Sequence, residues 1–301
     1  MKACVIRVEG MAEERIAVLR RLTEVRVDPL VEEVREIVVG EEDLLHSEYT
    51  DNVIASLDGV RVLFVAVPGA YATHIAKSAL RQGMHTFLGR SAAPSIAECQ
   101  SIAALSEEAG VEAGISRIMR FHPFLSALPE NWRANALTVR HERQRWDLKQ
   151  FRQMMEDAVD LCCNLAGTGD VRKIEAQQIQ NQQKLPGSLM IGFRFQNGTY
   201  AQIQLRHGVL ESRYEVYAGG SSMEFEMNLL NNTLHARNTS AVENDKGRFA
   251  FESQSLPNCD LIEQETITFL DSIASQKSVP VSIMEGLQTL QLIEGIRRAL
   301  R

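Results

Sequence analysis

Residues 61–90, RVLFVAVPGAYATHIAKSALRQGMHTFLGR, constrain the fold of this chain more than any other stretch. Val60–Val67 is a near-continuous apolar run, which is typical of a strand covered on both faces. A Pro-Gly turn follows, then a helical pattern over Thr73–Gln82 and a second short strand, His85–Leu88. A strand, a crossover helix and a further strand in this order predict half of a doubly wound nucleotide-binding fold.

Strand and helix patterns alternate up to about residue 120, which predicts a parallel α/β sheet. The other strands expected there are Ala3–Val8, Glu24–Val27 and Glu112–Ile115, and the other helices are Glu13–Leu22 and Ser95–Ala109. Ser95 is the expected N-cap of its helix and Gly110 the expected C-cap.

Beyond residue 120 the pattern changes to a long helix followed by runs rich in β-formers. The helix is Leu148–Ala166, and the runs are Val171–Gln178, Ser188–Phe195, Tyr200–Arg206, Glu211–Ala218, Ser222–Met227 and Thr233–Asn238. Asn197-Gly198 predicts a hairpin, because both residues readily take the positive φ angles of a two-residue turn. Two helices, Leu261–Ser275 and Ile283–Leu300, close the chain.

The 301 residues therefore predict two domains in an α/β protein. Residues 1–120 are expected to form a Rossmann-like parallel-sheet domain. Residues 121–301 are expected to form an α+β domain with a large, mostly antiparallel open sheet, and the last helix is expected to pack back on the first domain.

Composition excludes several classes of function. The formal charge of -7 lacks the excess of Lys and Arg that nucleic-acid binding needs. We find neither a membrane-length apolar run nor a signal-peptide pattern, so we expect a soluble, cytoplasmic protein with no membrane partner. The five cysteines contain no CxxC pair and favour reduced thiols, and no metal site is expected.

Short strings along nearly the whole chain occur in a characteristic order. They are Ala66-Val67-Pro68, Ala79-Leu80 with Gly83 and His85, Arg120-Phe121-His122-Pro123, Asp160 to Leu165, Phe195 to Thr199, Glu263 to Phe269, Val279-Pro280 and Gly286-Leu287. In order and spacing they resemble the Gfo/Idh/MocA family of NAD(P)-dependent oxidoreductases, which includes glucose-fructose oxidoreductase and inositol dehydrogenase.

This resemblance implies a first domain that binds NAD or NADP and a second domain whose open sheet forms homo-oligomer contacts. The site for the small-molecule substrate would lie between them. Members of the family pass a hydride between a sugar or polyol carbon and the nicotinamide, assisted by a lysine in a Glu-Lys-Pro motif and an Asp/His pair one helical turn apart.

The phosphate loop departs from the G-x-G-x-x-G pattern of dinucleotide-binding folds. Alignment on the first strand places Arg7, Glu9 and Ala12 at the three glycine positions, with Gly10 between them. A carboxylate at Glu9 repels a pyrophosphate, which argues against conventional cofactor binding.

The residues expected to contact the cofactor are Gly10, Ala12, Asp28, Val67 and Pro68. Asp28 stands at the end of the expected second strand, where an acidic residue accepts the ribose hydroxyls. An acidic turn residue before Pro29 explains Asp28 equally well.

The catalytic positions that the resemblance implies are also substituted. The Glu-Lys-Pro motif of the family aligns with Gly89, Arg90 and Ser91. Arg90 thus replaces the lysine, and an arginine keeps the positive charge but cannot lose its proton. Arg90 is either a clamp for a carboxylate or phosphate or a surface ion-pair partner.

The Asp-x-x-x-His motif of the family aligns with Gln153 and Asp157, which lie on the same face of a helix. An ion pair between Asp157 and Arg90 is one expectation, and such a pair would be structural because it weakens the carboxylate as a base.

Arg120 and His122 are expected to contact the substrate, since they lie in the crossing between the domains. A histidine packed or capped at a domain junction is the alternative for His122.

Three hypotheses follow. The protein is an NAD(P)-dependent oxidoreductase with an altered site, or a catalytically inactive relative that binds a small ligand or a partner. Alternatively, it is an oligomerisation subunit acting through a sheet face built from residues such as Met190, Phe193 and Leu205. The last two can coexist.

Overall fold

A computed structural model describes the chain except for residues 25–29, 93, 146, 181–185 and 239–250. The chain forms two compact units. The first is Met1–Ile118 with Asp260–Gln288, and the second is Met119–Cys259 with Thr289–Arg301. The division falls inside the last helix, α8 (Ile283–Ala299). Within the described residues, no helix is both long and apolar enough to span a membrane.

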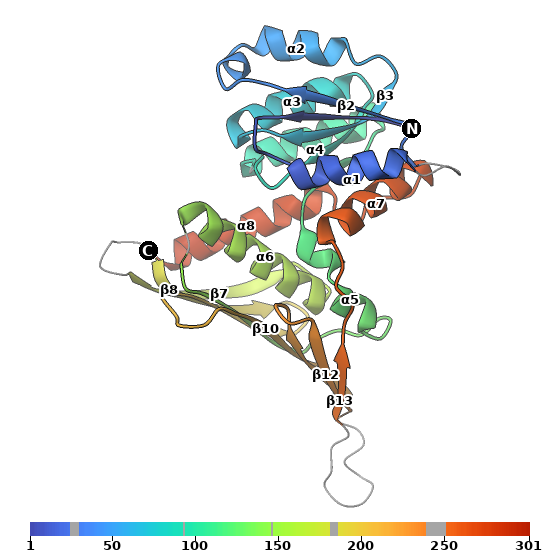
Figure 1. Ribbon diagram of the computed structural model, residues 1–301. Helices are drawn as coiled ribbons and strands as arrows, with labels where there is room; N and C mark the ends of the chain where they lie inside the picture. Colours follow the sequence, from blue (N-terminus) through green and yellow to red (C-terminus); the bar gives the residue numbers. More distant parts are fainter. Residues whose placement is uncertain (25–29, 93, 146, 181–185, 239–250) are drawn as a thin grey trace, which may run out of the picture. The chain divides into compact units, whose positions relative to one another are not determined.

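A five-stranded parallel sheet, in the order β2-β1-β3-β4-β5, forms the centre of the first unit. The strands are β1 (Lys2–Arg7), β2 (Glu33–Val38), β3 (Val60–Ala66), β4 (His85–Leu88) and β5 (Ala113–Ile115). The helices are α1 (Glu13–Thr23), α2 (Ser47–Ala55), α3 (Gly69–Arg81), α4 (Ile96–Ala109) and α7 (Leu261–Ala274), and η1 (Asp43–Leu45) is a short 3-10 turn. Helices α2, α3 and α4 lie on one face of the sheet, and α1 and α7 on the other (Figure 1). The predicted Rossmann-like architecture is confirmed.

The strongest local signals fold as predicted. Every residue of β3 except Arg61 is buried, as expected for a central strand with helices on both faces. Ser95 and Glu98 form a capping box at the start of α4, and Gly110 ends the helix with a left-handed φ of 66°.

The second strand lies at a different place from the predicted one. Glu24 is the C-cap of α1, and residues 25–29 lie outside the described part of the chain. The strand that pairs with β1 is Glu33–Val38, from Lys2 opposite Glu33 to Arg7 opposite Val38. Its sequence, EVREIV, lacks the apolar run of a central strand because β2 is an edge strand and only partly covered.

Asp260–Gln288 cluster with the first unit, although the sequence analysis placed them in the second domain. Phe269, Leu270 and Ile273 of α7 are buried in one cluster with strand residues of the parallel sheet. The rings of Phe269 and Phe87 pack edge to face with their centroids 4.9 Å apart. Helix α7 therefore buries its apolar stripe against this sheet.

The second unit contains an eight-stranded sheet in the order β13-β12-β11-β10-β6-β9-β8-β7. Its strands are β6 (Ala136–Arg143), β7 (Val171–Gln180), β8 (Pro186–Phe195), β9 (Tyr200–His207), β10 (Arg213–Gly219), β11 (Met223–Asn228), β12 (Thr233–Asn238) and β13 (Phe251–Ser255). The helical segments are η2 (Ile118–Phe121), α5 (Pro123–Ala127), α6 (Leu148–Ala166) and the end of α8. Neighbouring strands are antiparallel except for β6 and β9. The predicted, mostly antiparallel sheet is confirmed, and β6 and β13 are additions to it.

The two faces of this sheet differ in burial. Helix α6 covers one face, where Phe193 and Leu205 are fully buried. Met190 is 40% exposed and points to the opposite face, because side chains alternate along β8. The three residues named above for one oligomerisation face therefore do not share a face.

The hairpin between β8 and β9 is confirmed, with a turn different from the predicted one. Gly198 has a φ of 91°, whereas Asn197 is not among the residues with positive φ. The N–H of Gly198 donates to the carbonyl of Phe195 over 3.1 Å, and the N–H of Phe195 donates to the carbonyl of Thr199 over 2.9 Å. This is a three-residue loop with glycine at its left-handed position. The amide of Asn197 instead donates to the carbonyl of Ala166 over 2.9 Å.

Candidate functional site

The candidate site of the first unit is the carboxyl edge of its parallel sheet. Ligands of open α/β sheets bind beyond the carboxyl ends of the strands, near the point where the strand order reverses. Here β1 and β3 are the adjacent central strands, and their chains leave in opposite directions to β2 and β4. The segments at this edge are the β1–α1 loop, the turn at Val67 and Pro68, and the turn at Gly89 and Arg90.

The backbone of the β1–α1 loop is suited to an anion. Gly10 has a φ of 76°, and a Cβ placed on it would meet no atom within 4 Å. Ala12 is the N-cap of α1 in the left-handed region, with a φ of 57°, and its side chain forms no capping hydrogen bond. The first N–H groups of a helix have no partner within the helix and attract anions. The backbone of this loop therefore has two features that suit an anion, an open glycine and a helix N-terminus without a side-chain cap.

Arg7 lies beneath the loop and is held by two carboxylates. Its side chain is 10% exposed, and its Nε donates to Glu36 Oε1 on β2 over 2.8 Å. Its Nη1 lies 2.8 Å from Glu13 Oε1 at the start of α1. These hydrogen bonds and charges raise the pKa of Arg7, with the hydrogen bond to Glu36 as the largest cause. Glu36 also binds Arg20, whose Nη2 lies 2.5 Å from Glu36 Oε2.

Three exposed carboxylates lie in this loop or in the first turn of the helix that follows it. Glu9 precedes Gly10, and Glu13 and Glu14 occupy the first turn of α1. Glu13 is neutralised by Arg7, whereas Glu9 forms no ion pair with any residue that the structure describes. The backbone of the loop thus suits an anion, whereas the charge of Glu9 opposes one.

The neighbouring turns are shaped by close packing. Val67 is fully buried, and Pro68 is the N-cap of α3. The N–H of Gly89 donates to the carbonyl of Val65 over 2.9 Å, and a Cβ on Gly89 would lie 3.2 Å from that oxygen. The tight turn after β4 therefore leaves little room for a side chain at residue 89, and Arg90 is half-buried at the sheet edge.

Asp28 lies outside the described residues, and the acidic group at the end of β2 is a different one. The N–H of Val39 donates to the carbonyl of Arg7 over 2.9 Å, so the chain leaves the sheet at Gly40. Glu41 and Glu42 follow and are exposed, and Asp43 accepts from the N–H of Gly40 over 3.2 Å. Glu41 is therefore the first exposed acidic residue after the observed β2. The expectation that Asp28 contacts the ribose stays a prediction.

Gln153 and Asp157 lie one turn apart on α6 in the second unit, and both are half-buried. Asp147 begins this helix with a capping box to Gln150. Arg90 belongs to the first unit, so its pairing with Asp157 stays a prediction.

Arg120 is held by the same helix. Its Nε and Nη2 each donate to a carboxylate oxygen of Asp160 over 2.9 Å, and Asp160 is 1% exposed. The hydroxyl of Thr289 lies 3.3 Å from the same carboxylate. This bidentate pair fixes η2 against α6 and α8, so Arg120 has a structural role whatever else it contacts.

His122 is buried and caps α5. Its Nδ1 accepts from the N–H of Phe124 over 3.4 Å, and its ring packs on that of Phe124 with centroids 5.1 Å apart. Burial lowers the pKa of His122. This is the packed or capped histidine named as the alternative above, and a substrate contact by His122 stays a prediction.

Sequence reasoning also missed a polar aromatic pair on the covered face of the second sheet. The rings of His141 on β6 and Tyr214 on β10 stack with centroids 3.9 Å apart and planes inclined by 8°. Their direct opposition in the β6–β10 ladder produces the stack. The signal was hidden because β6 was not recognised as a strand.

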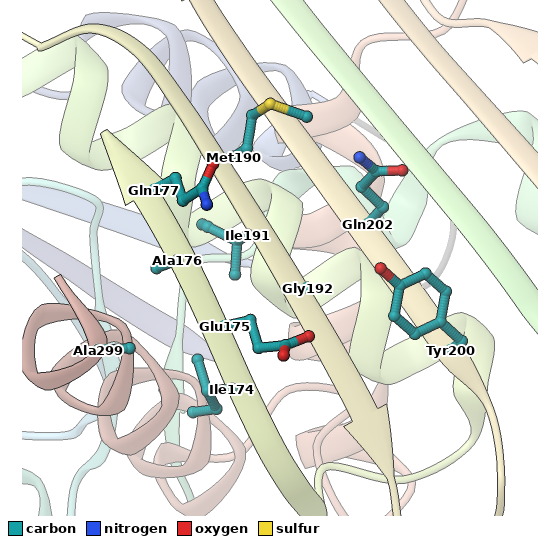
Figure 2. A pocket seen from close by; sticks show the side chains of 10 residues that line it. All are labelled: Ile174, Glu175, Ala176, Gln177, Met190, Ile191, Gly192, Tyr200, Gln202 and Ala299. Carbon is teal, nitrogen blue, oxygen red and sulfur yellow. The ribbon is translucent and has the colours of Figure 1, made fainter. Parts of the chain in front are cut away.

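A separate hollow of about 620 Å³ lies on the strands β7, β8 and β9 of the second unit. Figure 2 shows Glu175, Gln177 and Tyr200 among its lining side chains, with Gly192 between them. The phenol oxygen of Tyr200 lies 3.3 Å from the place where a Cβ of Gly192 would be. None of the site residues predicted from the sequence lines this hollow.

Comparison with known proteins finds similarity in structure alone. No family model and no curated protein sequence matches the chain. UDP-N-acetylglucosamine 3-dehydrogenase from Acidithiobacillus ferrooxidans matches 100% of this chain and 97% of its own, with a TM-score of 0.81 and 18% identity. An NAD-binding oxidoreductase from Klebsiella pneumoniae matches 100% of this chain and 97% of its own, with a TM-score of 0.80 and 11% identity. A levoglucosan dehydrogenase in complex with NADH and levoglucosan matches 99% of this chain and 96% of its own, with a TM-score of 0.77 and 14% identity. The chain shares the whole two-part fold of these oxidoreductases.

Proposed function

We propose that the protein is a divergent oxidoreductase of the Gfo/Idh/MocA type that uses NAD or NADP and acts on a sugar or polyol. The observation that carries the proposal is the match of both units to sugar-directed and NAD-binding oxidoreductases over the full chain. Fold alone does not define activity, so the residues at the sheet edge and on α6 carry the remaining argument.

The first unit supplies the groups that would hold the dinucleotide. Gly10 and Ala12 present the backbone of the β1–α1 loop, and Val67 and Pro68 form the adjacent turn after β3. Glu41 is a second candidate for the ribose contact besides Asp28, since it follows β2 and is exposed. When bound, the nicotinamide supplies hydride chemistry that no side chain provides.

Substrate handling falls to Arg90, Gln153 and Asp157. Arg90 is permanently cationic, so it binds and polarises a substrate oxygen and does not exchange a proton. Asp157 accepts a proton from a hydroxyl, and Gln153 holds the substrate by hydrogen bonds. Arg120 and His122 hold the segment through which the chain enters the second unit.

The second candidate is a catalytically inactive relative that binds a small ligand or a partner. It is supported by substitutions at two kinds of position at once. Arg7 and Glu9 stand where the phosphate loop has glycines, and Arg90 stands where a lysine is expected. Loss of cofactor contacts and of the proton donor together points to loss of turnover.

Homo-oligomer formation through the open face of the second sheet is part of either proposal. Opposite charges are interspersed on this face. Arg206 Nη1 lies 3.2 Å from Glu142 Oε1, and Arg140 Nη1 lies 3.8 Å from Glu215 Oε2. Such a mixed surface complements itself when two copies meet about a two-fold axis.

Calorimetric titration with NADH and NADPH, on protein freed of bound nucleotide, tests the proposal. Micromolar binding followed by reduction of NAD in a screen of sugars and polyols supports the oxidoreductase. No heat at millimolar cofactor rejects it and leaves the inactive relative. Sedimentation of the same sample measures the number of copies.

A further inference from the structure

We infer that Glu9 sets the affinity of the β1–α1 loop for a dinucleotide, because the loop backbone accepts a pyrophosphate and this one carboxylate opposes it. The inference rests on the proposed cofactor class. The inference is that one side chain causes weak cofactor binding, and that the conformation of the loop backbone does not.

The backbone of the β1–α1 loop is a compact turn with an open glycine. Gly10 at a φ of 76° has open space above it, and α1 runs for 11 residues from an N-cap without a side-chain hydrogen bond. The N–H of Met11 donates to the carbonyl of Val8 over 3.0 Å, which closes a compact turn between the strand and the helix. A group of Cβ size on Gly10 would meet no neighbouring atom, so the backbone is open at this position.

Arg7 cannot offset the charge of Glu9. Its Nε and Nη2 lie 2.8 Å and 2.7 Å from Glu36 Oε1, and its Nη1 lies 2.8 Å from Glu13 Oε1. A buried guanidinium that holds two carboxylates is neither free to turn toward Glu9 nor free to bind a phosphate. The cation at the first glycine position is thus already neutralised.

Glu9 is the remaining charge next to the flexible glycine. It is exposed, and it forms no ion pair with the described residues. A carboxylate within a few ångströms of a pyrophosphate is repelled strongly where water is partly excluded. Glu14 is equally acidic and exposed, but it lies within the first turn of α1, which makes it a matched control for a general change of net charge.

The experiment compares the wild-type protein with E9Q, E9G and E14Q. Each is titrated with NADH, with ADP-ribose, which keeps the pyrophosphate, and with adenosine, which lacks it. E9Q removes only the charge, and E9G also restores the small residue. We expect both to bind NADH and ADP-ribose about tenfold more tightly than wild type, with adenosine and the E14Q variant unchanged. Higher salt should narrow the difference between wild type and E9Q, because it screens the repulsion.

Equal affinities of wild type and E9Q for ADP-ribose overturn the inference, and so does an equal gain in E14Q. Unchanged thermal midpoints show that the variants are folded. A different result would reject the proposed function alone. If E9G binds NADH tightly but no variant oxidises a sugar or polyol, the role of Glu9 is supported and the proposed reaction is rejected. If wild type already binds NADH at micromolar concentration and E9Q adds nothing, the oxidoreductase stands and the role of Glu9 does not.

Discussion

Arg15 Nη2 lies 2.5 Å from Glu265 Oε2, although the two residues are 250 positions apart in the chain. Both are buried, Glu265 to 1% exposure. Glu265 also accepts from the hydroxyl of Ser116 over 2.9 Å and from the N–H of Arg117 over 2.7 Å. One carboxylate therefore joins α7 to α1 and to the end of β5, which explains why this late segment belongs to the first unit.

Substitution of Glu265 should destabilise the first unit strongly. E265Q leaves the buried guanidinium of Arg15 without its counter-charge, and the expected loss is about 3 kcal/mol in the free energy of unfolding. Urea denaturation measures it. The control is E263Q, whose partner Arg21 is half-exposed and 3.2 Å away, and this change should cost less than about 1 kcal/mol. Similar losses in the two variants would refute the role given to Glu265.

Replacement of Gln276 by glycine should stabilise the protein. Gln276 follows α7 with a φ of 54°, while the N–H of Lys277 donates to the carbonyl of Ser272 over 2.9 Å. This is a Schellman motif. Helix α4 ends in the same way, with Gly110 at the left-handed position. Q276G removes the strain of a side chain in the left-handed region and should add about 0.5–1 kcal/mol. Thermal melting checks it, and Q276A, which keeps a Cβ, should show no gain.

The buried thiols should resist alkylation in the folded protein. Burial raises the pKa of Cys4 to about 12 and that of Cys163 to about 12, the latter with help from Asp160. Because only the thiolate reacts, iodoacetamide near neutral pH should modify the partly exposed Cys259 first. Peptide mass mapping against time reads the order. Modification of Cys4 as fast as Cys259 would contradict the burial of Cys4.

The same thiols should make stability fall at alkaline pH. In the unfolded chain a cysteine loses its proton near its ordinary pKa of 9.0, while folded Cys4 keeps it to about 12. The stabilisation is complete below about pH 9 and is lost as the pH rises toward 12. Urea midpoints across this range measure the fall, and C4A should reduce it. An unchanged slope in C4A would show that other groups cause it.

R90K should raise NAD-dependent turnover. The sequence predicts that Arg90 replaces the catalytic lysine of the family that the chain resembles, and an arginine cannot exchange a proton. A lysine there is expected to raise the oxidation rate about 100-fold, with activity increasing with pH as the amine loses its proton. R90Q is the control and should show no gain. If R90K and R90Q behave alike, position 90 takes no part in proton transfer.

Local pattern predicted most elements because the relevant forces act between near neighbours in sequence. The apolar run of β3 and the caps of α4 at Ser95 and Gly110 can each be recognised from a few residues. The substitutions at Glu9 and Arg90 could also be read directly, since alignment to a loop pattern needs no coordinates.

The sequence by itself determined the fold class and most of the elements in their order, and it predicted which site positions are altered. Only the tertiary structure decided that EVREIV pairs with β1, that Arg7 is held by Glu36 and Glu13, and that α7 belongs to the first unit. The physical reason is that an edge strand, a buried ion pair and a shared core each depend on partners far away in the chain. A local pattern contains no information about such partners.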